Sequence, residues 1–342
     1  MKKQYLIISI IILFSFIIII LYEPSEEPRY KIIFCSAINA PRDSVDFQIN
    51  PQKYFELYSM NLDGSNIVRI TNNSFFEVQP EVSPDGKKIL YSIHYSPGRV
   101  KEIDSGWEIA VMNIDGTNHK RLTNNNYLDF GAHWNHDGSK IVYVSDSAHR
   151  TNEDIQNNML SKLDIYVMNV DGTDKRQLTE GRVGDVYADP SFSTTDTNKI
   201  LFIHSRGLAG NFDLYVMDVD GDNKHLILQH SDDLLAINDP MFSPNDEFII
   251  FEAKVRENRY GNRIYNIFIV NLDGSELMRI TEDDGESDIL PHISLDGKMI
   301  CYYTYVFEDD GNTHKIRIAN VDGSEEEIIS IYPWESDLSW LP

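Results

Sequence analysis

Four carboxylates at one repeating position are residues that could carry chemistry in this chain. Each stands five residues before the apolar or aromatic residue that closes a predicted strand, and the four are Glu77, Asp129, Asp288 and Glu335. In the other copies this position holds Tyr187 and Ile237, and further carboxylates stand nearby at Asp185, Asp189 and Asp239. A ring of carboxylates would focus negative potential and attract a cation, or a Lys or Arg of a partner. The alternative is that each carboxylate accepts hydrogen bonds from backbone N–H groups where the chain turns, which requires no ligand.

A basic, aromatic segment stands out against the acidic background. Its residues are Lys254, Arg256, Arg259, Tyr260, Arg263 and Tyr265. Such a segment could grip an acidic glycan or peptide; the alternative is a solvated loop that pairs with neighbouring carboxylates.

The histidines, cysteines and acidic loops do not predict a metal centre. His133 and His292 share one register, but the repeats that hold them are not neighbours, so histidines satisfied between blades are the simpler interpretation. DVDGDN at Asp218 lacks the glycine and distal glutamate of a calcium loop, and EDDGESD over 282–288 is a weak calcium candidate. We therefore expect no cofactor, with Ca²⁺ at 282–288 as the alternative.

The elements that must position these residues come from a phrase that the chain repeats. LYSMNLDGSNIVRIT begins at Leu57, IYVMNVDGTDKRQLT at Ile165, and four similar copies carry the same Asp-Gly pair. The six glycines, 49 to 56 residues apart, are Gly64, Gly116, Gly172, Gly221, Gly274 and Gly323. A strand-rich repeat of this length is typical of a propeller or a solenoid.

Each repeat contains four short predicted strands. The second phrase, such as VSPDGKKILYS from Val82, supplies a tight turn followed by a buried strand. The chain ends on a first strand containing Trp340, whereas residues 30–36 match a second strand that lacks its partner. We therefore predict an all-β, six-bladed propeller in which the C-terminal strand joins the N-terminal strands in one blade, because closure removes exposed strand edges. An open solenoid is the alternative.

These phrases resemble the repeat of the TolB-type β-propeller family, and the similarity covers residues 30–342. The resemblance implies a propeller without the N-terminal α/β domain of TolB itself, and it implies no particular activity, since the same repeat occurs in periplasmic scaffolds, peptidase accessory domains and some lyases. The peptidases of this kind append an α/β-hydrolase domain, but this sequence has no G-x-S-x-G nucleophile motif.

The N-terminus predicts export. An uncharged apolar run, Leu6 to Tyr22, follows Lys2 and Lys3 and precedes several glutamates. We interpret 1–22 as an uncleaved transmembrane helix, 23–29 as a tether and 30–342 as a propeller outside the cytoplasm, because no small-residue cleavage site stands near Tyr22. A cleaved, secreted form is the alternative.

The net charge of the chain indicates which classes of partner it can bind. With 30 Lys plus Arg against 54 Asp plus Glu, the net charge is −24, which disfavours nucleic acid. Cys35 and Cys301 are expected at different heights in their sheets and therefore unpaired. The sequence predicts a non-catalytic scaffold that binds a protein or cell-envelope ligand on the rim with the longer loops; the alternative is a carbohydrate-active enzyme such as a polysaccharide lyase.

Overall fold

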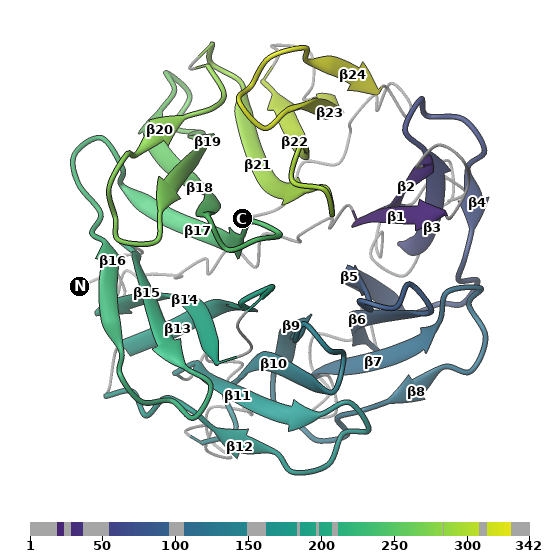
Figure 1. Cartoon of the computed structure of the whole chain (residues 1–342). Helices are drawn as coiled ribbons and strands as arrows, with labels where there is room; N and C mark the ends of the chain where they lie inside the picture. The colour runs from purple at the N-terminus through teal and green to yellow at the C-terminus, as the bar shows by residue number, and fades with distance from the viewer. Residues whose placement is uncertain are drawn as a thin grey trace, which may run out of the picture.

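The predicted short strands pair into sheets arranged radially around one axis (Figure 1). The computed structural model describes residues 19–23, 29–36, 55–95, 106–148, 162–182, 185–195, 198–206, 211–282, 284–307 and 313–329. Within these residues, six antiparallel four-stranded sheets form an all-β, six-bladed propeller. The sequence prediction of the fold is confirmed to this extent.

Each blade consists of an inner, a second, a third and an outer strand. Blade one contains β1 (Ile19–Glu23), β2 (Arg29–Ser36), β3 (Glu56–Asn61) and β4 (Val68–Arg69). Blade two contains β5 (Phe76–Val82), β6 (Lys88–His94), β7 (Trp107–Asn113) and β8 (Lys120–Arg121). Blade three contains β9 (Asp129–Trp134), β10 (Lys140–Ser145), β11 (Asp164–Asn169) and β12 (Arg176–Gln177). Blade four contains β13 (Asp185–Phe192), β14 (Lys199–Arg206), β15 (Asp213–Asp218) and β16 (His225–Leu228). Blade five contains β17 (Ala236–Phe242), β18 (Phe248–Glu257), β19 (Arg263–Asn271) and β20 (Met278–Arg279). Blade six contains β21 (Ser287–Ile293), β22 (Met299–Val306), β23 (Thr313–Asn320) and β24 (Glu327–Ile329).

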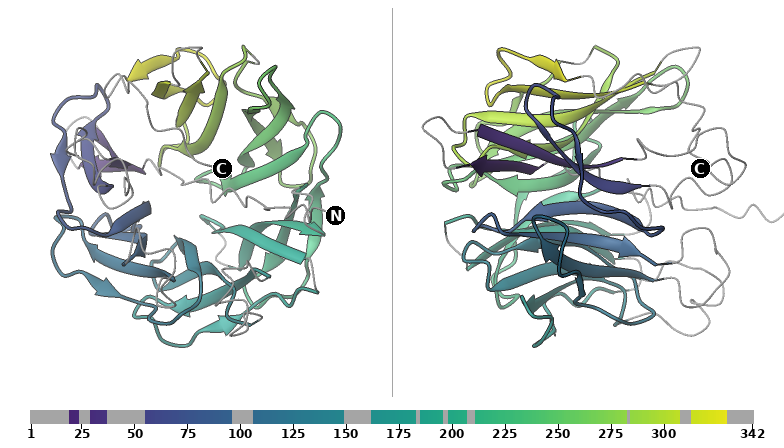
Figure 2. Two further views of the ribbon diagram at one scale, coloured as in Figure 1. Left: turned by 180° about the vertical axis from the view of Figure 1, so that it is seen from behind. Right: turned by 90° about the vertical axis from the view of Figure 1, so that its right-hand side faces the viewer.

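The strand ends lie at two opposite faces of the propeller (Figure 2). We call the face with the turns between inner and second strands, and between third and outer strands, the turn face. The face with the other connections is the link face. The second strands are buried on both sides, as in β6, where Ile89, Leu90 and Tyr91 are at most 1% exposed. Blade packing on both sides therefore explains why these strands lack polar alternation.

The Asp-Gly pairs form the turns that the sequence predicts. Gly116 has φ of 81°, a left-handed conformation that glycine adopts without strain. A Cβ atom at this position would also lie only 2.4 Å from the carbonyl oxygen of Ile70 in the preceding blade. The glycine thus allows both the turn and the contact between blades.

A bulge interrupts each described inner strand of blades two to six. The residue with positive φ at the bulge is Gln79, Gly131, Asp189, Asp239 or Leu290. Its N–H group can bond to the preceding blade: the Gly131 N–H donates to Gln79 Oε1 at 3.1 Å and that of Asp239 to Asp189 Oδ2 at 3.2 Å. The bulges therefore link neighbouring blades along the channel.

Blade one differs from the prediction. Its inner strand is β1, paired with β2 from Ile19↔Ile33 to Glu23↔Arg29, and not the segment containing Trp340, which lies outside the described residues. β1 also contains Ile19 to Tyr22, the end of the predicted transmembrane helix. β-branched and aromatic residues favour strands, and this run directly precedes β2, so a local antiparallel pairing is available to it. The rest of the apolar run, up to residue 18, lies outside the described residues.

A second correction concerns 254–266, which the sequence treats as a long loop. β18 and β19 continue as a hairpin out to the pair Glu257↔Arg263, and only 258–262 form the turn. The Asn258 side chain accepts the N–H groups of Tyr260 and Asn262, which stabilises this turn locally. Cys35 and Cys301 are buried free thiols. Within the described residues, no helix has the length and apolarity to span a membrane.

Candidate functional site

The predicted carboxylates of the repeating position lie inside the blades. Glu77, Asp129 and Asp288 are 1%, 2% and 5% exposed. Their oxygens accept hydrogen bonds from Asn73 Nδ2 at 2.9 Å, Asn125 Nδ2 at 2.7 Å and Thr304 Oγ1 at 2.7 Å, respectively. Glu335 lies outside the described residues. The donors are side chains and not the backbone N–H groups of the capping alternative. The burial of the three carboxylates leaves them little access to a ligand.

Burial determines the protonation of this group. It raises the pKa of Glu77 to about 7 and that of Asp288 to about 6, against hydrogen bonds that act in the opposite direction. Burial also raises the pKa of Asp129. Glu77 and Asp288 therefore carry less negative charge near neutral pH than exposed carboxylates would.

A neighbouring set of carboxylates, which sequence reasoning missed, begins the third strands. Glu108 accepts the Asn125 N–H at 2.6 Å and pairs with Arg121 of the outer strand at 2.9 Å. Glu56 does the same in blade one, with Asn73 N–H and Arg69 both at 2.8 Å. The signal was present in the sequence as a carboxylate and an arginine thirteen residues apart in successive copies.

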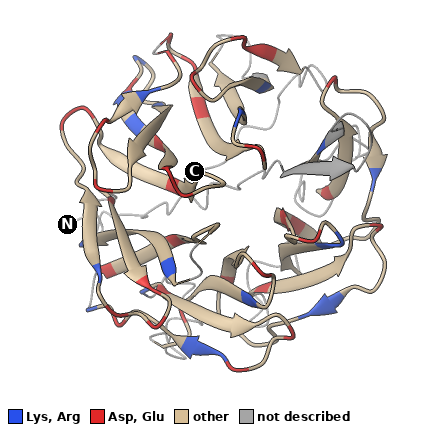
Figure 3. Cartoon of the chain, viewed as in Figure 1, with Lys and Arg blue, Asp and Glu red and all other residues tan. Residues whose placement is uncertain are grey.

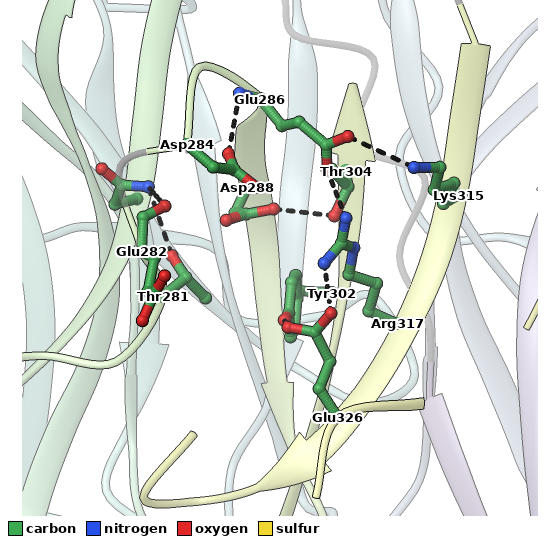
Figure 4. Close-up of polar contacts among 11 residues, drawn as sticks. Thr281, Glu282, Asp284, Glu286, Asp288, Tyr302, Thr304, Lys315, Arg317 and Glu326 are labelled. Atoms are coloured by element: carbon green, nitrogen blue, oxygen red, sulfur yellow. Dashed lines mark hydrogen bonds and ion pairs between the residues drawn. The ribbon is translucent and has the colours of Figure 1, made fainter. Parts of the chain in front are cut away.

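The calcium candidate is occupied by basic side chains of the protein (Figure 4). Glu286 pairs with Lys315 at 3.2 Å and with Arg317, which also binds Glu326. Asp284 Oδ1 accepts the Glu286 N–H at 2.9 Å, and Asp288 is held by Thr304. The Asp284, Glu286 and Asp288 carboxylates thus bind protein donors.

The basic aromatic segment lies on the β18–β19 hairpin, where Arg259, Tyr260 and Arg263 are exposed and Tyr265 is buried. Lys254 pairs with Glu257 at 2.6 Å, and the Arg259 guanidinium lies over the Tyr260 ring, 4.6 Å from its centre. Tyr260 is 56% exposed. In the pairing of β18 with β19, Arg256 is opposite Ile264 and Arg263 is opposite Glu257. The segment is therefore an ordered projection on the link face, with Tyr260 its most accessible ring.

A cavity of about 650 Å³ opens at the turn face of the central channel. One register position from five inner strands lines it: Glu81, His133, Ser191, Met241 and His292. Trp134, Phe192 and Phe242 add aromatic surface, and Asp85, Leu295 and Asp296 belong to the turns around the opening. The sequence places its candidates on the opposite face, because it cannot show how similar turns from different blades enclose a common space.

His133 and His292, which the sequence pairs only by register, both line this cavity. His133 Nδ1 lies 3.5 Å from Glu81 Oε1, and Glu81 Oε2 accepts the Trp134 N–H at 2.9 Å. Burial acts to lower the pKa of His133, but the Glu81 carboxylate outweighs it and the pKa is raised. Burial, with a smaller effect of the His133 charge, lowers the pKa of His292 to about 3. Cationic character therefore belongs to His133, while His292 is neutral.

A second cavity, of about 400 Å³, lies at the link-face end of blade four. His204, Arg206, Asp213, Tyr215 and His230 are among its lining residues. Within the described residues, no group of three or more His, Cys, Asp or Glu side chains is arranged to hold a metal ion.

Comparison with known proteins agrees with the repeat. Residues 99–254 match the TolB beta propeller domain (PD40). The blades within this range are similar to the TolB beta propeller repeat. A segment of the chain is 23% identical over 137 residues to a "Protein TolB homolog" of Chlorobium luteolum, covering 30% of this chain and 31% of that protein. The matched segment spans less than a third of the length of that curated relative.

Solved structures show the same TolB-type fold. TolB from Acinetobacter baumannii aligns with a TM-score of 0.58 and 17% identity, covering 80% of this chain and 59% of that one. An oligogalacturonate lyase in complex with manganese aligns with a TM-score of 0.57 and 12% identity, covering 91% and 76%. At these identities the similarity concerns the fold, which proteins of different function share.

Proposed function

We propose that this TolB-type propeller is a non-catalytic binding module outside the cytoplasm and that it binds a protein ligand at the channel cavity of the turn face. The observation that supports the proposal most is the cavity itself. It is large enough for a side chain or short loop, and five blades contribute to it, so its lining is chemically varied although each turn is simple.

The lining suggests the chemistry of the ligand. Asp85 and Asp296 belong to the turns around the opening, and Leu295, next to Asp296 in the chain, is 64% exposed. Trp134 and Phe242 supply apolar surface further in. A protein segment with an apolar anchor and a neighbouring Lys or Arg is complementary to such a site, because the anchor would be desolvated in the centre and the charge would remain at the rim.

Among the groups that could act as acid or base in the cavity, Glu81 has structural partners and His292 is buried and neutral. Glu81 accepts the Trp134 N–H and so joins the inner strands of blades two and three. His292 stays neutral at physiological pH because of its burial. We therefore favour recognition over the enzymatic alternative of a propeller-fold lyase.

The test compares the two faces by affinity capture with the full chain from detergent-solubilised envelopes. In the turn-face variant, Asp85→Asn, Asp296→Asn and Leu295→Ser are combined; in the matched link-face variant, Arg259→Gln and Tyr260→Ser are combined. We expect the turn-face variant to lose a partner that the wild type and the link-face variant retain, with unchanged melting temperatures. Loss only in the link-face variant would place recognition on the other face, and turnover of an oligosaccharide by the wild type would favour the enzyme.

The location is a separate part of the proposal and rests on the sequence. Lys2 and Lys3 before an apolar run favour an N-terminus in the cytoplasm and a propeller outside. Attachment to the membrane by this run is a proposal that competes with β1, since Ile19 to Tyr22 cannot be in a spanning helix and in β1 at once. Membrane fractionation with N-terminal sequencing tests it: a soluble product that begins near Ser25 would contradict attachment.

A further inference from the structure

One buried histidine in the channel cavity of the turn face has no partner in the protein. His292 lies on β21, lines the cavity and is only 9% exposed. Within the described residues, neither ring nitrogen of His292 forms a hydrogen bond, and neither is closed off from solvent as His204 Nε2 is. The imidazole therefore offers the cavity a hydrogen-bonding capacity that the fold itself does not use.

The other buried polar side chains in the described wall of this cavity each have a hydrogen-bond partner within the protein. They are Ser83, Asn135, Ser191 and Ser193. Ser191 Oγ, for example, donates to the Pro240 carbonyl oxygen at 2.9 Å. A ligand gains little from such groups, because it must first break the bond that they already make. His292 is therefore the polar group on which a buried ligand gains most.

The charges around the cavity favour a neutral ligand group. Glu81, Asp85 and Asp296 belong to its lining, and the described lining contains no Lys or Arg. The basic side chains of the outer strands β4, β8 and β12 lie at the circumference of the ring, away from the channel (Figure 3). An anion would have only His133 to compensate it, and Glu81 already engages that ring at 3.5 Å. Burial lowers the pKa of His292 to about 3, so its ring is neutral as well.

Aromatic and sulfur-containing side chains supply apolar surface to the same cavity. Trp134, Phe192 and Phe242 belong to its lining, and Met241 adds a thioether. Such surface suits a flat apolar ring, because aromatic rings pack well in offset or edge-to-face contacts and a methionine sulfur contacts ring edges favourably. The volume of about 650 Å³ admits an aromatic side chain together with the backbone that carries it.

A phenol meets both requirements, an apolar ring and a neutral hydrogen-bonding tip. A neutral imidazole has one donor and one acceptor nitrogen, and a hydroxyl can serve either, whereas an indole N–H only donates. Resting on the proposed recognition of a protein at this cavity, we propose that the partner inserts a tyrosine side chain, with its ring among Trp134, Phe242 and Met241 and its hydroxyl bonded to His292.

The probe is N-acetyltyrosinamide, added to the full chain in detergent and followed by calorimetric titration and by the NMR shifts of the histidine ring nitrogens. N-acetylphenylalaninamide lacks only the hydroxyl, and the corresponding glutamate and lysine compounds carry a negative and a positive charge. We expect saturable binding of the tyrosine compound, at least about fivefold tighter than that of the phenylalanine compound, because a buried hydrogen bond is gained. Only the tyrosine compound should shift the ring nitrogens of His292.

Variants locate the effect in the cavity. His292→Phe keeps a ring and removes the nitrogens, so the tyrosine compound should then bind no better than the phenylalanine compound. The control His225→Phe, at an exposed position on β16, should leave the preference intact. If His292→Phe does not fold, Met241→Trp fills the cavity from blade five and should abolish binding of both compounds; unchanged binding would place the ligand elsewhere.

Several results would overturn the tyrosine proposal. They are equal affinity for the phenylalanine compound, preference for the glutamate or lysine compound, no saturable binding, and unmoved ring nitrogens of His292. None of these would refute recognition at the turn face, where capture of a partner that depends on Asp85, Leu295 and Asp296 would remain. Failure of the proposed function shows itself differently, as capture lost only in the link-face variant.

Discussion

Blades two and four share one repeat but use its link-face end differently. In blade two, Glu108 is 2% exposed and holds both Arg121 and the Asn125 backbone, so the end of the blade is closed by its own side chains. In blade four, Leu226 replaces the arginine, Asp213 turns to His230, and a cavity remains. The difference shows that the repeat can keep its backbone while Asp213, Leu226 and His230 take the positions of Glu108, Arg121 and Asn125 and a cavity replaces the structural bridge.

The largest effect that we expect is a difference between blades two and four in how they make the free energy of unfolding depend on pH. The pKa of Glu77 is raised to about 7 from an ordinary value near 4.5, chiefly by burial. The folded state therefore retains a proton that the unfolded state loses, and the stability due to this group is complete below pH 4.5 and lost as the pH rises through 7, by up to about 3 kcal/mol. Glu77→Gln should reduce that slope in urea unfolding between pH 4.5 and 7 and leave the part due to other buried carboxyl groups such as Asp288.

Tyr187 occupies the same register in blade four and serves as the control. Tyr187→Phe should leave the slope between pH 4.5 and 7 as it is in the wild type. A Glu77→Gln protein with the full wild-type slope would show that another carboxyl group carries the dependence.

The next effect contrasts the two third-strand carboxylates. Glu108→Ala leaves the Asn125 N–H and Arg121 without their acceptor in a buried site, at a cost of about 2 to 3 kcal/mol. Asp213→Ala should cost about 1 kcal/mol, since the cavity admits water to the groups left behind. Free energies of unfolding from urea titrations measure both, and equal losses would contradict the distinction between a closed and an open blade.

A smaller effect follows from making blade two resemble blade four. Arg121→Leu removes the charge partner of Glu108 but retains the Asn125 hydrogen bond, so we expect a loss of about 1 to 2 kcal/mol. Arg279→Leu in blade five is matched in register, but the position of its third strand that corresponds to Glu108 holds the uncharged Asn266, and it should cost less. Thermal unfolding of the two variants side by side tests the order; the reverse order would argue against the bridge.

The smallest effect is the converse change. Leu226→Arg places a guanidinium near Asp213 at a partly exposed position, where a pair contributes only about 0.5 kcal/mol. We expect a slight rise in melting temperature. A fall of several degrees would mean that blade four cannot accommodate the bridge of the repeat.

Much of the fold could be predicted from the sequence because the same four-strand repeat occurs six times. Turn residues such as Gly116 and the doubly buried strands such as β6 follow from local composition and period alone. The inner strand of blade one could not be predicted in this way, since two apolar segments are each compatible with pairing to β2 and the sequence does not rank them. The β18–β19 hairpin was not predicted because its charged residues are typical of a solvated loop.

The candidate sites could be predicted less well because they depend on distances between blades. The position of Glu77 was found, but its burial, which decides its role, comes from packing of neighbouring strands. His133 and His292 share a register that alone does not reveal a common cavity. The register of Arg69 and Arg121 holds Gln177, Leu226 and Ile328 in other copies, so the sequence alone does not single out blade four.

Site-specific photo-crosslinking in cells tests the central claim, recognition at the channel cavity of the turn face, most directly. A photoreactive residue is placed at Leu295 on the rim of that cavity, at Tyr260 on the link face, and at Val68 on an outer strand, three sites that are 64%, 56% and 56% exposed. Our account predicts one dominant protein adduct from position 295 that disappears when Asp85→Asn and Asp296→Asn are combined. The same adduct from position 260 or 68, with none from 295, would contradict it.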